Sequence, residues 1–361
     1  MNTRTYTLLG STTYDADKTE IIDLDVQDPI SQIAVVYRPV NVVTGTQLAH
    51  PAASITKIEI VDGSEVLWSL SGREAQALDY YHRQIEPFNY MDITDGGSPM
   101  VTIMLNFGRF LFDSELAFNP LNYKNPQLKI SIDLNAQSAD IVAGSMQVFA
   151  ELFDEKVITP VGYLMGKEVE SYTLGDNAHH YVDMPTDKVW RKLLVRAQRN
   201  GTDWASQIAH IKLSQDADKK VIFDHDSFPF AAHQASQVRP YREHIFGSGN
   251  IAARYGYCTP GFHVRFASTA WRATIGGGDQ AFFGGSGGRF QYIQAVAGPN
   301  WQAIVEGWLP HSVVEYPFGL QQDIGDWFDP VNVGSMKLDI TGGAAVDTQP
   351  CDVFLQELVK Y

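Results

Sequence analysis

The sequence predicts an all-β protein of two tandem eight-stranded β-sandwiches, with a few short helices in loops. Two observations lead to this fold class. Short apolar or alternating runs bounded by Gly, Pro, Asn and Asp recur along all 361 residues, which is the pattern of strands joined by turns. Similar runs also return in the same order in the second half of the chain, as a duplicated fold requires.

The predicted strands occupy both halves. They lie at 21–26, 55–61, 100–107, 127–134 and 146–153, and again at 192–198, 208–214, 219–224, 336–340 and 351–358. Helical periodicity is scarce. Its clearest example is residues 71–84, where good helix formers carry an apolar stripe and Pro87 ends the pattern.

The repeat begins with matches near the start of each half. Tyr6-Thr7-Leu8 before Gly10 matches Tyr172-Thr173-Leu174 before Gly175, Ile22-Asp23-Leu24 matches Val182-Asp183-Met184, and Ile33 and Val35 match Leu193 and Val195. The last two matches share a constant spacing, from 22 to 182 and from 33 to 193. One strand pair therefore aligns without a gap.

The repeat continues in the same order along the chain. Ile55, Ile58 and Ile60 match Ile208, Ile211 and Leu213; Val66-Leu67-Trp68 matches Val221-Ile222-Phe223; Leu128-Lys129-Ile130 matches Met336-Lys337-Leu338; and Val148-Phe149 matches Val353-Phe354. Each match alone is weak, because all strands alternate. Their common order favours duplication over coincidence.

A pair of turns gives the best single match. Phe107-Gly108 followed by Phe118-Asn119-Pro120-Leu121-Asn122 matches Phe318-Gly319 followed by Phe328-Asp329-Pro330-Val331-Asn332. Asn or Asp before Pro is turn chemistry, because the side-chain oxygen accepts hydrogen bonds from nearby backbone amides while Pro fixes its own φ. We expect Phe118, Asn119, Pro120 and their counterparts Phe328, Asp329, Pro330 to form equivalent structural turns.

The repeat predicts two domains, residues 1–160 and 161–361. The second domain carries extra material at about 239–317, including a glycine-rich segment at 276–288 that we expect to form an exposed loop, either flexible or tightly folded. The insert is rich in aromatic residues, of which Trp271, Phe282, Phe283, Trp301 and Trp308 are candidate interface residues. A small core beneath the loop explains them equally well.

Composition narrows the function classes. The net charge of −15 disfavours nucleic-acid binding by counterion release, and charged residues make up only 19% of the chain, which suggests a surface partly covered by other subunits. No apolar run is long enough for a signal-peptide core or a spanning helix, so we expect folding in a cytoplasm. Cys258 and Cys351 suggest reduced, packed thiols.

No motif predicts chemistry. The histidines at 179, 180, 210, 225, 233 and 244 include no His-x-His pair, and adjacent histidines on a strand point to opposite faces, so we predict no metal site and no cofactor. Asp216, Asp218, Asp224 and Asp226 are typical of acidic turns. The glycine-rich segment lacks a phosphate-loop motif, no nucleophile elbow occurs, and Arg239, Arg242, His244 and Arg254 suggest a local ion-pair patch. We therefore predict no catalytic residue.

Two tandem β-sandwiches of this length fit a pair of eight-stranded jelly rolls, an architecture that viral capsid proteins share with cupins. The fold alone leaves three function classes open. A structural shell protein is the first. A bicupin-type metal enzyme would hold iron or manganese through histidines, and a glycan-binding tandem sandwich would use exposed aromatic residues such as Trp271 or Trp301.

The duplicated F-[ND]-P-[LV]-N turn, the helix-bearing loop and the insert in the second half resemble double jelly-roll major capsid proteins of tailless icosahedral viruses, the lineage of the adenovirus hexon. The resemblance covers nearly the whole chain. It implies a homotrimer whose six jelly rolls give a pseudo-hexagonal outline and tile a virion capsid. Neighbouring trimers, penton or minor capsid proteins and an internal membrane are the partners it implies.

Overall fold

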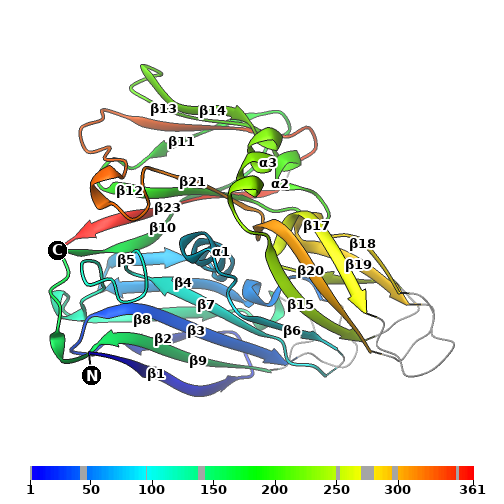
Figure 1. Cartoon of the computed structure of the whole chain (residues 1–361), viewed down its shortest axis with the longest axis horizontal. Helices are drawn as coiled ribbons and strands as arrows, with labels where there is room; N and C mark the ends of the chain where they lie inside the picture. Colours follow the sequence, from blue (N-terminus) through cyan, green and yellow to red (C-terminus); the bar gives the residue numbers. More distant parts are fainter. Residues whose placement is uncertain are drawn as a thin grey trace.

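The computed structural model describes residues 2–40, 47–94, 96–136, 143–248, 253–269, 280–294, 300–346 and 349–361. Its architecture is two β-sandwiches joined by a helix, with a β-rich extension at one end (Figure 1). None of the described helices combines the length and the apolar character that crossing a membrane requires.

The first sandwich packs two antiparallel four-stranded arrays against each other. One contains β1 (Thr3–Tyr14), β9 (Ala143–Phe153), β3 (Ile30–Val40) and β7 (Met100–Asn106), in that order. The other contains β2 (Lys18–Asp23), β8 (Pro126–Ile132), β4 (Ile55–Asp62) and β5 (Glu65–Leu70). Alternate residues of these strands point inward, so that each strand contributes one apolar face.

The second sandwich repeats this arrangement. Its first array contains β10 (Gly162–Thr173), β23 (Pro350–Lys360), β12 (Val189–Ala197) and β21 (Val313–Pro317). Its second contains β11 (His179–Met184), β22 (Met336–Gly342), β13 (Ile208–Gln215) and β14 (Lys220–Asp226). A parallel contact of Lys167 with Ser69 joins β10 to β5, so one eight-stranded sheet passes through both sandwiches. The prediction of two eight-stranded sandwiches is confirmed for the described strands.

Each sandwich has its own apolar core, and both cores reach beyond the strands. The first core includes side chains from the helix α1 and from the insert, and the second lies between the two arrays of the second sandwich. Leu116, Leu164, Trp327 and Leu358 form a smaller cluster where loops of both halves meet. Cys258 and Cys351 are buried free thiols, as expected.

Backbone pairing confirms the predicted spacing of 160 residues. Ile30 exchanges two backbone hydrogen bonds with Phe118, of 2.7 and 2.9 Å, and Trp190 exchanges two with Phe328, of 2.8 and 3.1 Å. Residues 30 and 190 occupy the same place at the start of β3 and β12. The two halves therefore fix their Phe-Asx-Pro turns in the same way.

Irregularities in the strands also recur. Ile60 pairs with Trp68 and a β-bulge follows it, and Leu213 pairs with Phe223 and is likewise followed by a bulge. A bulge inserts one extra residue and bends its strand, so it is a specific feature rather than a general property of sheets. Its presence at matched positions supports common ancestry of the sandwiches.

Two of the sequence matches join the right strands in the wrong register. The first is the match of Leu128 with Met336. Leu128 pairs with Ile22, and Leu338 pairs with Val182, so the counterpart of Leu128 is Leu338 and not Met336. A shift of two residues leaves every side chain on the same face of the strand. The apolar pattern therefore could not distinguish the two registers.

The match at the start of each half was also misplaced. Thr12 pairs with Met146, which lies two residues before Val148. Tyr172 pairs with Cys351, which lies two residues before Val353, the counterpart of Val148. The counterpart of Tyr172 is thus Thr12 rather than Tyr6. β1 and β10 are the correct pair of strands, but the shift of six residues again preserved the alternation.

The predicted helix at 71–84 is confirmed as α1 (Gly72–Arg83). Ser71 caps it: its Oγ accepts from the Glu74 amide at 3.4 Å while the Glu74 carboxylate accepts from the Ser71 amide at 2.7 Å. Two further helices, α2 (Trp204–Gln207) and α3 (Ser227–Gln237), were not predicted. The α3 sequence carries Pro229 and no clear apolar stripe, so tertiary packing rather than periodicity defines it.

Short 3-10 turns complete the described connections. They are η1 (Pro51–Ser54), η2 (Pro120–Asn122), η3 (Leu134–Ala136), η4 (Asp154–Lys156), η5 (Ser286–Gly288) and η6 (Ile324–Asp326).

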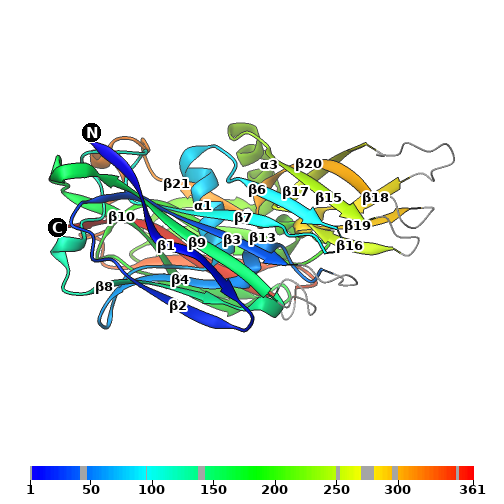
Figure 2. The same cartoon turned by 90° about the horizontal axis from the view of Figure 1, so that it is seen from below.

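The insert differs from the expected loop because most of its described residues form strands. β15 (Tyr241–Ser248), β20 (Asn300–Pro310) and β17 (Pro260–Thr269) continue the β1-β9-β3-β7 array, through β6 (Asn89–Ile93). β16 (Arg254–Tyr257), β19 (Arg289–Gln294) and β18 (Gln280–Gly284) form a separate small sheet. The end of the predicted range is also corrected, because β21 pairs with β12 and belongs to the second sandwich. Figure 2 shows the extension projecting at one end.

The described part of the glycine-rich segment is tightly folded. Gly287 has a φ of +64° and lies so close to the loop after β12 that an added Cβ would stand 2.0 Å from the Arg199 carbonyl oxygen. The Gly201 amide donates to Ser286 at 3.0 Å. Glycine is required here by both conformation and space.

Candidate functional site: the seam between the two sandwiches

The histidines that could suggest a metal are distributed over the surface. His179 Nδ1 lies 2.9 Å from Asp339, and His210 Nε2 lies 2.8 Å from Asp224, in the outer array of the second sandwich. Within the residues that the structure describes, no group of three or more His, Cys, Asp or Glu side chains is placed to hold a metal ion. His179 and His210 pair with these carboxylates on neighbouring strands, whereas the ring of His225 is stacked on that of Phe230 with a centroid distance of 4.0 Å.

The other polar candidates make local contacts. Asp216 Oδ1 accepts from the amides of Gly334 at 3.0 Å and Ser335 at 3.2 Å, which is the turn chemistry expected of the acidic segment. Arg242 forms an ion pair with Glu306 at 2.8 Å on an exposed strand. This contact matches the predicted ion-pair patch.

The aromatic residues of the insert mainly extend the core of the first sandwich. Trp301 is 2% exposed, and its ring lies 5.1 Å from that of Phe282 and 4.8 Å from that of Tyr292. Trp308 is half-buried and donates through Nε1 to the Val238 carbonyl at 3.3 Å. Phe283 alone of the described candidates is strongly exposed, at 55%, and Trp271 lies outside the described residues.

The two predicted turns have matching geometry. The Asn119 side chain accepts from the Leu121 amide at 3.3 Å, and the Asp329 side chain accepts from the Val331 amide at 3.0 Å. The following prolines, Pro120 and Pro330, are both buried. These residues therefore position the loops at one end of each sandwich.

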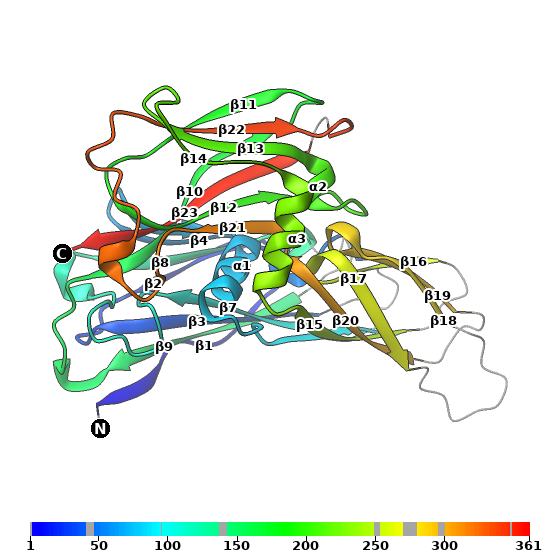
Figure 3. The ribbon, with the colours of Figure 1, turned by 45° about the horizontal axis from the view of Figure 1, so that its top comes forward.

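The strongest concentration of buried polar groups lies between the two sandwiches, where α1 is wedged (Figures 1 and 3). We call this region the seam; it consists of α1 and the faces of β12, β21 and β23 that point toward it. α1 buries ten of its twelve residues. Tyr81 Oη donates to the Val313 carbonyl at 2.7 Å, and Arg73 donates to Gln198 at 3.2 Å. The helix thus belongs to the first sandwich and is held by the second.

Buried charges of the second sandwich line the seam, and one of them also bonds to α1. Lys192 donates to Glu315 at 2.5 Å and to the Tyr81 carbonyl at 3.2 Å, and Arg196 donates to Asp352 at 2.6 Å. All four of these residues are less than 10% exposed. Such pairs add little net stability against an apolar core, but breaking one leaves an uncompensated buried charge. The second sandwich therefore presents to α1 a face on which each of these four buried charges has an opposite charge beside it.

Burial also controls protonation in the seam. Desolvation and the nearby Arg191 guanidinium keep the pKa of His82 well below its ordinary value, so the ring is neutral and its Nδ1 accepts from Arg191 at 2.7 Å. Desolvation lowers the pKa of Arg191 itself to about 10. Burial and the neighbouring Asp352 raise the pKa of Glu74 to about 7.

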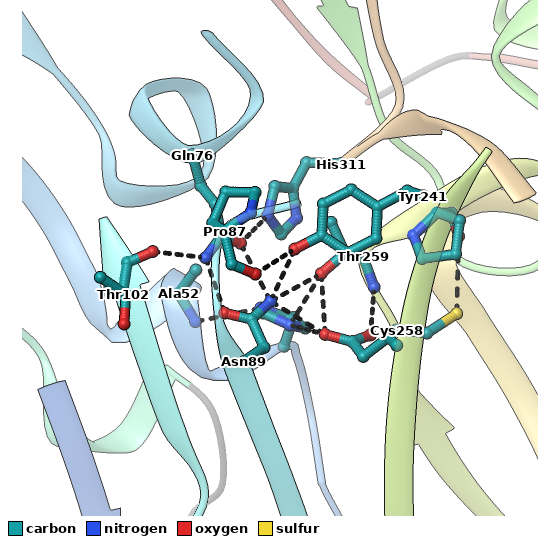
Figure 4. A network of polar contacts seen from close by, with 12 residues as sticks. Ala52, Gln76, Pro87, Asn89, Thr102, Tyr241, Cys258, Thr259 and His311 are labelled. Atoms are coloured by element: carbon teal, nitrogen blue, oxygen red, sulfur yellow. Dashed lines mark hydrogen bonds and ion pairs between the residues drawn. The ribbon is translucent and has the colours of Figure 1, made fainter. Parts of the chain in front are cut away.

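A second buried network fixes the insert to the first sandwich and its helix α1 (Figure 4). The Glu243 carboxylate of β15 accepts from the Asn89 side chain at 2.9 Å and from the Thr259 amide at 2.9 Å. Burial raises the pKa of Glu243, but these bonds and the nearby His50 outweigh it, so the pKa lies below its ordinary value. His311 reaches the same network through a 2.7 Å contact with Gln76.

His50 joins the first sandwich to this network. The Ala52 amide donates to His50 Nδ1 at 3.1 Å, so this nitrogen accepts. His50 Nε2 lies 3.1 Å from the Thr259 hydroxyl and 3.4 Å from Glu243. The network is a closed structural joint, because its groups point to one another rather than to solvent.

Comparison with known proteins identifies the architecture. No protein-family model and no curated protein matches the sequence. The major capsid protein of Sulfolobus Turreted Icosahedral Virus matches 100% of this chain and 97% of its own, with a TM-score of 0.62 and 11% identity. The major capsid protein P2 from bacteriophage PM2 matches 99% of this chain and 98% of its own, with a TM-score of 0.56 and 10% identity.

The fold is the double jelly roll. The PBCV-1 protein VP54 supports the same conclusion, matching 99% of this chain and 94% of its own, with a TM-score of 0.60 and 11% identity. The two sandwiches described above are therefore the first and second jelly rolls. The likeness extends over the whole chain, insert included, as the sequence resemblance implied.

Sequence reasoning missed the residues of the seam. Lys192 and Arg196 stand four residues apart in a strand that also contains Arg191, and Asp352 lies near the start of another strand. Charged residues on one face of a strand usually indicate solvent. Here they indicate a second buried face, which only the position of α1 reveals.

Proposed function

We propose that this chain is the major capsid protein of an icosahedral virus and that it acts by forming pseudo-hexagonal homotrimers that tile the virion shell. The observation that carries the proposal is the seam: two jelly rolls with matching turns and bulges, locked together by a helix that is buried between them. The full-length likeness to major capsid proteins supports it.

The function would be geometric. Three chains supply six similar jelly rolls, and a ring of six similar units has a near-hexagonal outline that fits a hexagonal lattice. Such a ring requires a constant angle between consecutive units. A rigid seam provides that angle within each chain. Residues 1–160 and 161–361 would be the two building blocks, and the proposal needs no catalytic residue and no cofactor.

The partners follow from the same proposal. Each trimer would contact neighbouring trimers, and penton or minor capsid proteins would close the shell, with an internal membrane as a further partner beneath it. The chain would fold in the host cytoplasm and reside in the virion capsid. The charge of −15 supports a shell that holds its genome without binding nucleic acid directly.

The mass of the purified protein in solution tests the proposal. Sedimentation velocity or mass photometry should give a particle of three times the chain mass of 40.1 kDa. A stable monomer that binds iron or manganese stoichiometrically would overturn it and favour the bicupin alternative. A monomer that binds glycans through Phe283 would favour the lectin-like alternative.

A further inference from the structure

Two helices occupy the same place in the two jelly rolls. α1 follows β5 after the cap residue Ser71, and α3 follows β14 after the cap residue Asp226. Trp68 pairs with Ile60, and Phe223 pairs with Leu213 in the same way, so Trp68 and Phe223 are counterparts that lie 155 residues apart. The counterpart of each α1 residue therefore lies 155 positions later. The two N-caps, 71 and 226, obey the same spacing.

The two helices differ sharply in burial. α1 buries ten of its twelve residues, whereas α3 buries three of its eleven, namely Ser227, Ala231 and Gln234. α1 lies between the jelly rolls, and α3 lies against β13 and β14 of the second (Figure 3). α3 thus has an open face where α1 has a partner.

The open face of α3 corresponds to the contact face of α1. The exposed α3 residues are Phe228, Pro229, Ala232, His233, Ser236 and Gln237. At a spacing of 155, Phe228, Ser236 and Gln237 are the counterparts of Arg73, Tyr81 and His82. These three α1 residues contact the second jelly roll through Gln198, Val313 and Arg191 respectively.

The first jelly roll presents the face that would receive such a helix. In the second jelly roll, Leu194 and Phe354 point toward α1 and are fully buried. Their counterparts, by the register of β3 and β9, are Ala34 and Phe149. Both are only half-buried, as are Val36 and Met104 on the same side of the array. This face, formed by β3, β7 and β9, is the equivalent of the seam without its helix.

We propose that the open face of α3 packs against the β3-β7-β9 face of a second copy of this chain, in the way that α1 packs within one chain. The inference rests on the proposed trimer and specifies its interface. Repeating the same contact inside and between chains allows three chains to close a ring of six units. Phe228 of one copy would then lie near Arg38 of the next, because Arg73 contacts Gln198.

The chemistry of both faces fits this pairing. α3 contains no Asp, Glu, Lys or Arg. The counterparts of the charged seam residues Lys192, Arg196 and Glu315 on the first jelly roll are Gln32, Val36 and Met104, which are neutral. A helix face without Asp, Glu, Lys or Arg would thus meet a sheet face that lacks these three buried ions. The charged residues on that sheet face, Arg38 and Glu151, are exposed and half-buried respectively.

A disulfide test probes the contact directly. The double variant Arg38→Cys/Phe228→Cys, oxidised under mild conditions, should give covalent trimers on a non-reducing gel, and each single variant should not. The native thiols Cys258 and Cys351 are buried and do not compete. The control Arg38→Cys/Tyr181→Cys uses a residue that is 56% exposed on a different surface and should form no crosslinked trimer.

A second measurement uses charge instead of crosslinks. Phe228→Asp and Val36→Asp should each raise the trimer dissociation constant at least tenfold in sedimentation velocity, whereas Tyr181→Asp should leave it unchanged. If the wild-type chain is a trimer but the double-cysteine variant crosslinks no better than its control, or both aspartate variants stay trimeric, the α3 contact is wrong while the proposed function stands. If the wild-type chain is a monomer, the proposed function fails with it.

Discussion

The ring of Phe107 lies 5.3 Å from the ring of Phe118, at an interplanar angle of 34°. Phe318 and Phe328 repeat this arrangement in the second jelly roll, with 5.4 Å and 32°. Aromatic pairs tolerate many tilted geometries. The close agreement therefore reflects two copies of one turn, each ending in an Asx-Pro pair.

The equivalence of the turns predicts equal effects of equal substitutions. Asn119→Ala and Asp329→Ala each remove a side-chain oxygen that accepts a backbone amide, so each should lower the free energy of unfolding by about 1 kcal/mol. Chemical denaturation measures both. Asn119→Asp and Asp329→Asn keep the acceptor and should have little effect. A large loss for one alanine variant and none for the other would contradict the shared turn.

Breaking a buried ion pair should destabilise the seam. Arg196→Met removes the cationic partner of the Asp352 carboxylate, which keeps its bond from Ser171, and should cost about 3–5 kcal/mol in urea denaturation. The double variant Arg196→Met/Asp352→Leu should recover most of this loss.

The exposed pair of Arg242 and Glu306 is the matched control for the seam pair. Arg242→Met should cost at most about 1 kcal/mol, because water screens surface pairs. Equal losses for Arg196→Met and Arg242→Met would show that the seam is not a closed, dry contact.

The start of α1 should not tolerate a side chain larger than glycine's. A Cβ at Gly72 would lie 2.6 Å from the Ala52 carbonyl oxygen and 2.8 Å from Ile55 Cβ. Gly72→Ala should therefore lower the free energy of unfolding by about 1–3 kcal/mol, as overpacking does. Gly10→Ala, in β1 with nothing within 4 Å, is the control and should be neutral in the same thermal melts.

Glu357 should make stability depend on pH. Its carboxyl is 1% exposed, neither oxygen has a hydrogen-bond partner among the described residues, and burial raises its pKa from 4.5 to about 7. Between these values the folded chain holds a proton that the unfolded chain releases. The free energy of unfolding should therefore fall as pH rises from about 4.5 to 7, by up to about 3 kcal/mol.

The variant Glu357→Gln isolates this contribution. It carries no titrating proton, so its stability should exceed that of the wild type above pH 7 and show a smaller decrease between pH 5 and 7. Urea denaturation at pH 5 and pH 8 gives the comparison. Identical pH profiles for the two proteins would exclude Glu357 as the source.

Part of this structure could be predicted from the sequence. The fold class, the helix after Ser71 and the paired turns at Pro120 and Pro330 follow from local chemistry that acts within a few residues. The registers of β1 and β8 could not be found in the same way, because alternation has a period of two and even shifts leave it unchanged. Pairing across strands, as between Ile22 and Leu128, was needed.

The seam and the insert lay beyond the sequence for a different reason. Lys192 and Glu315 are far apart in the chain, and nothing near either residue indicates that α1 covers both. The aromatic residues around Trp301 are equally consistent with a core or an interface until their partners are known. Long-range contacts decide the environment of such residues.

Electron micrographs of the purified protein test the central claim most directly, that two locked jelly rolls per chain build a six-unit ring. Two-dimensional class averages should show a particle with six lobes and a near-hexagonal outline. Class averages with two lobes, the size of a single chain, would contradict the account.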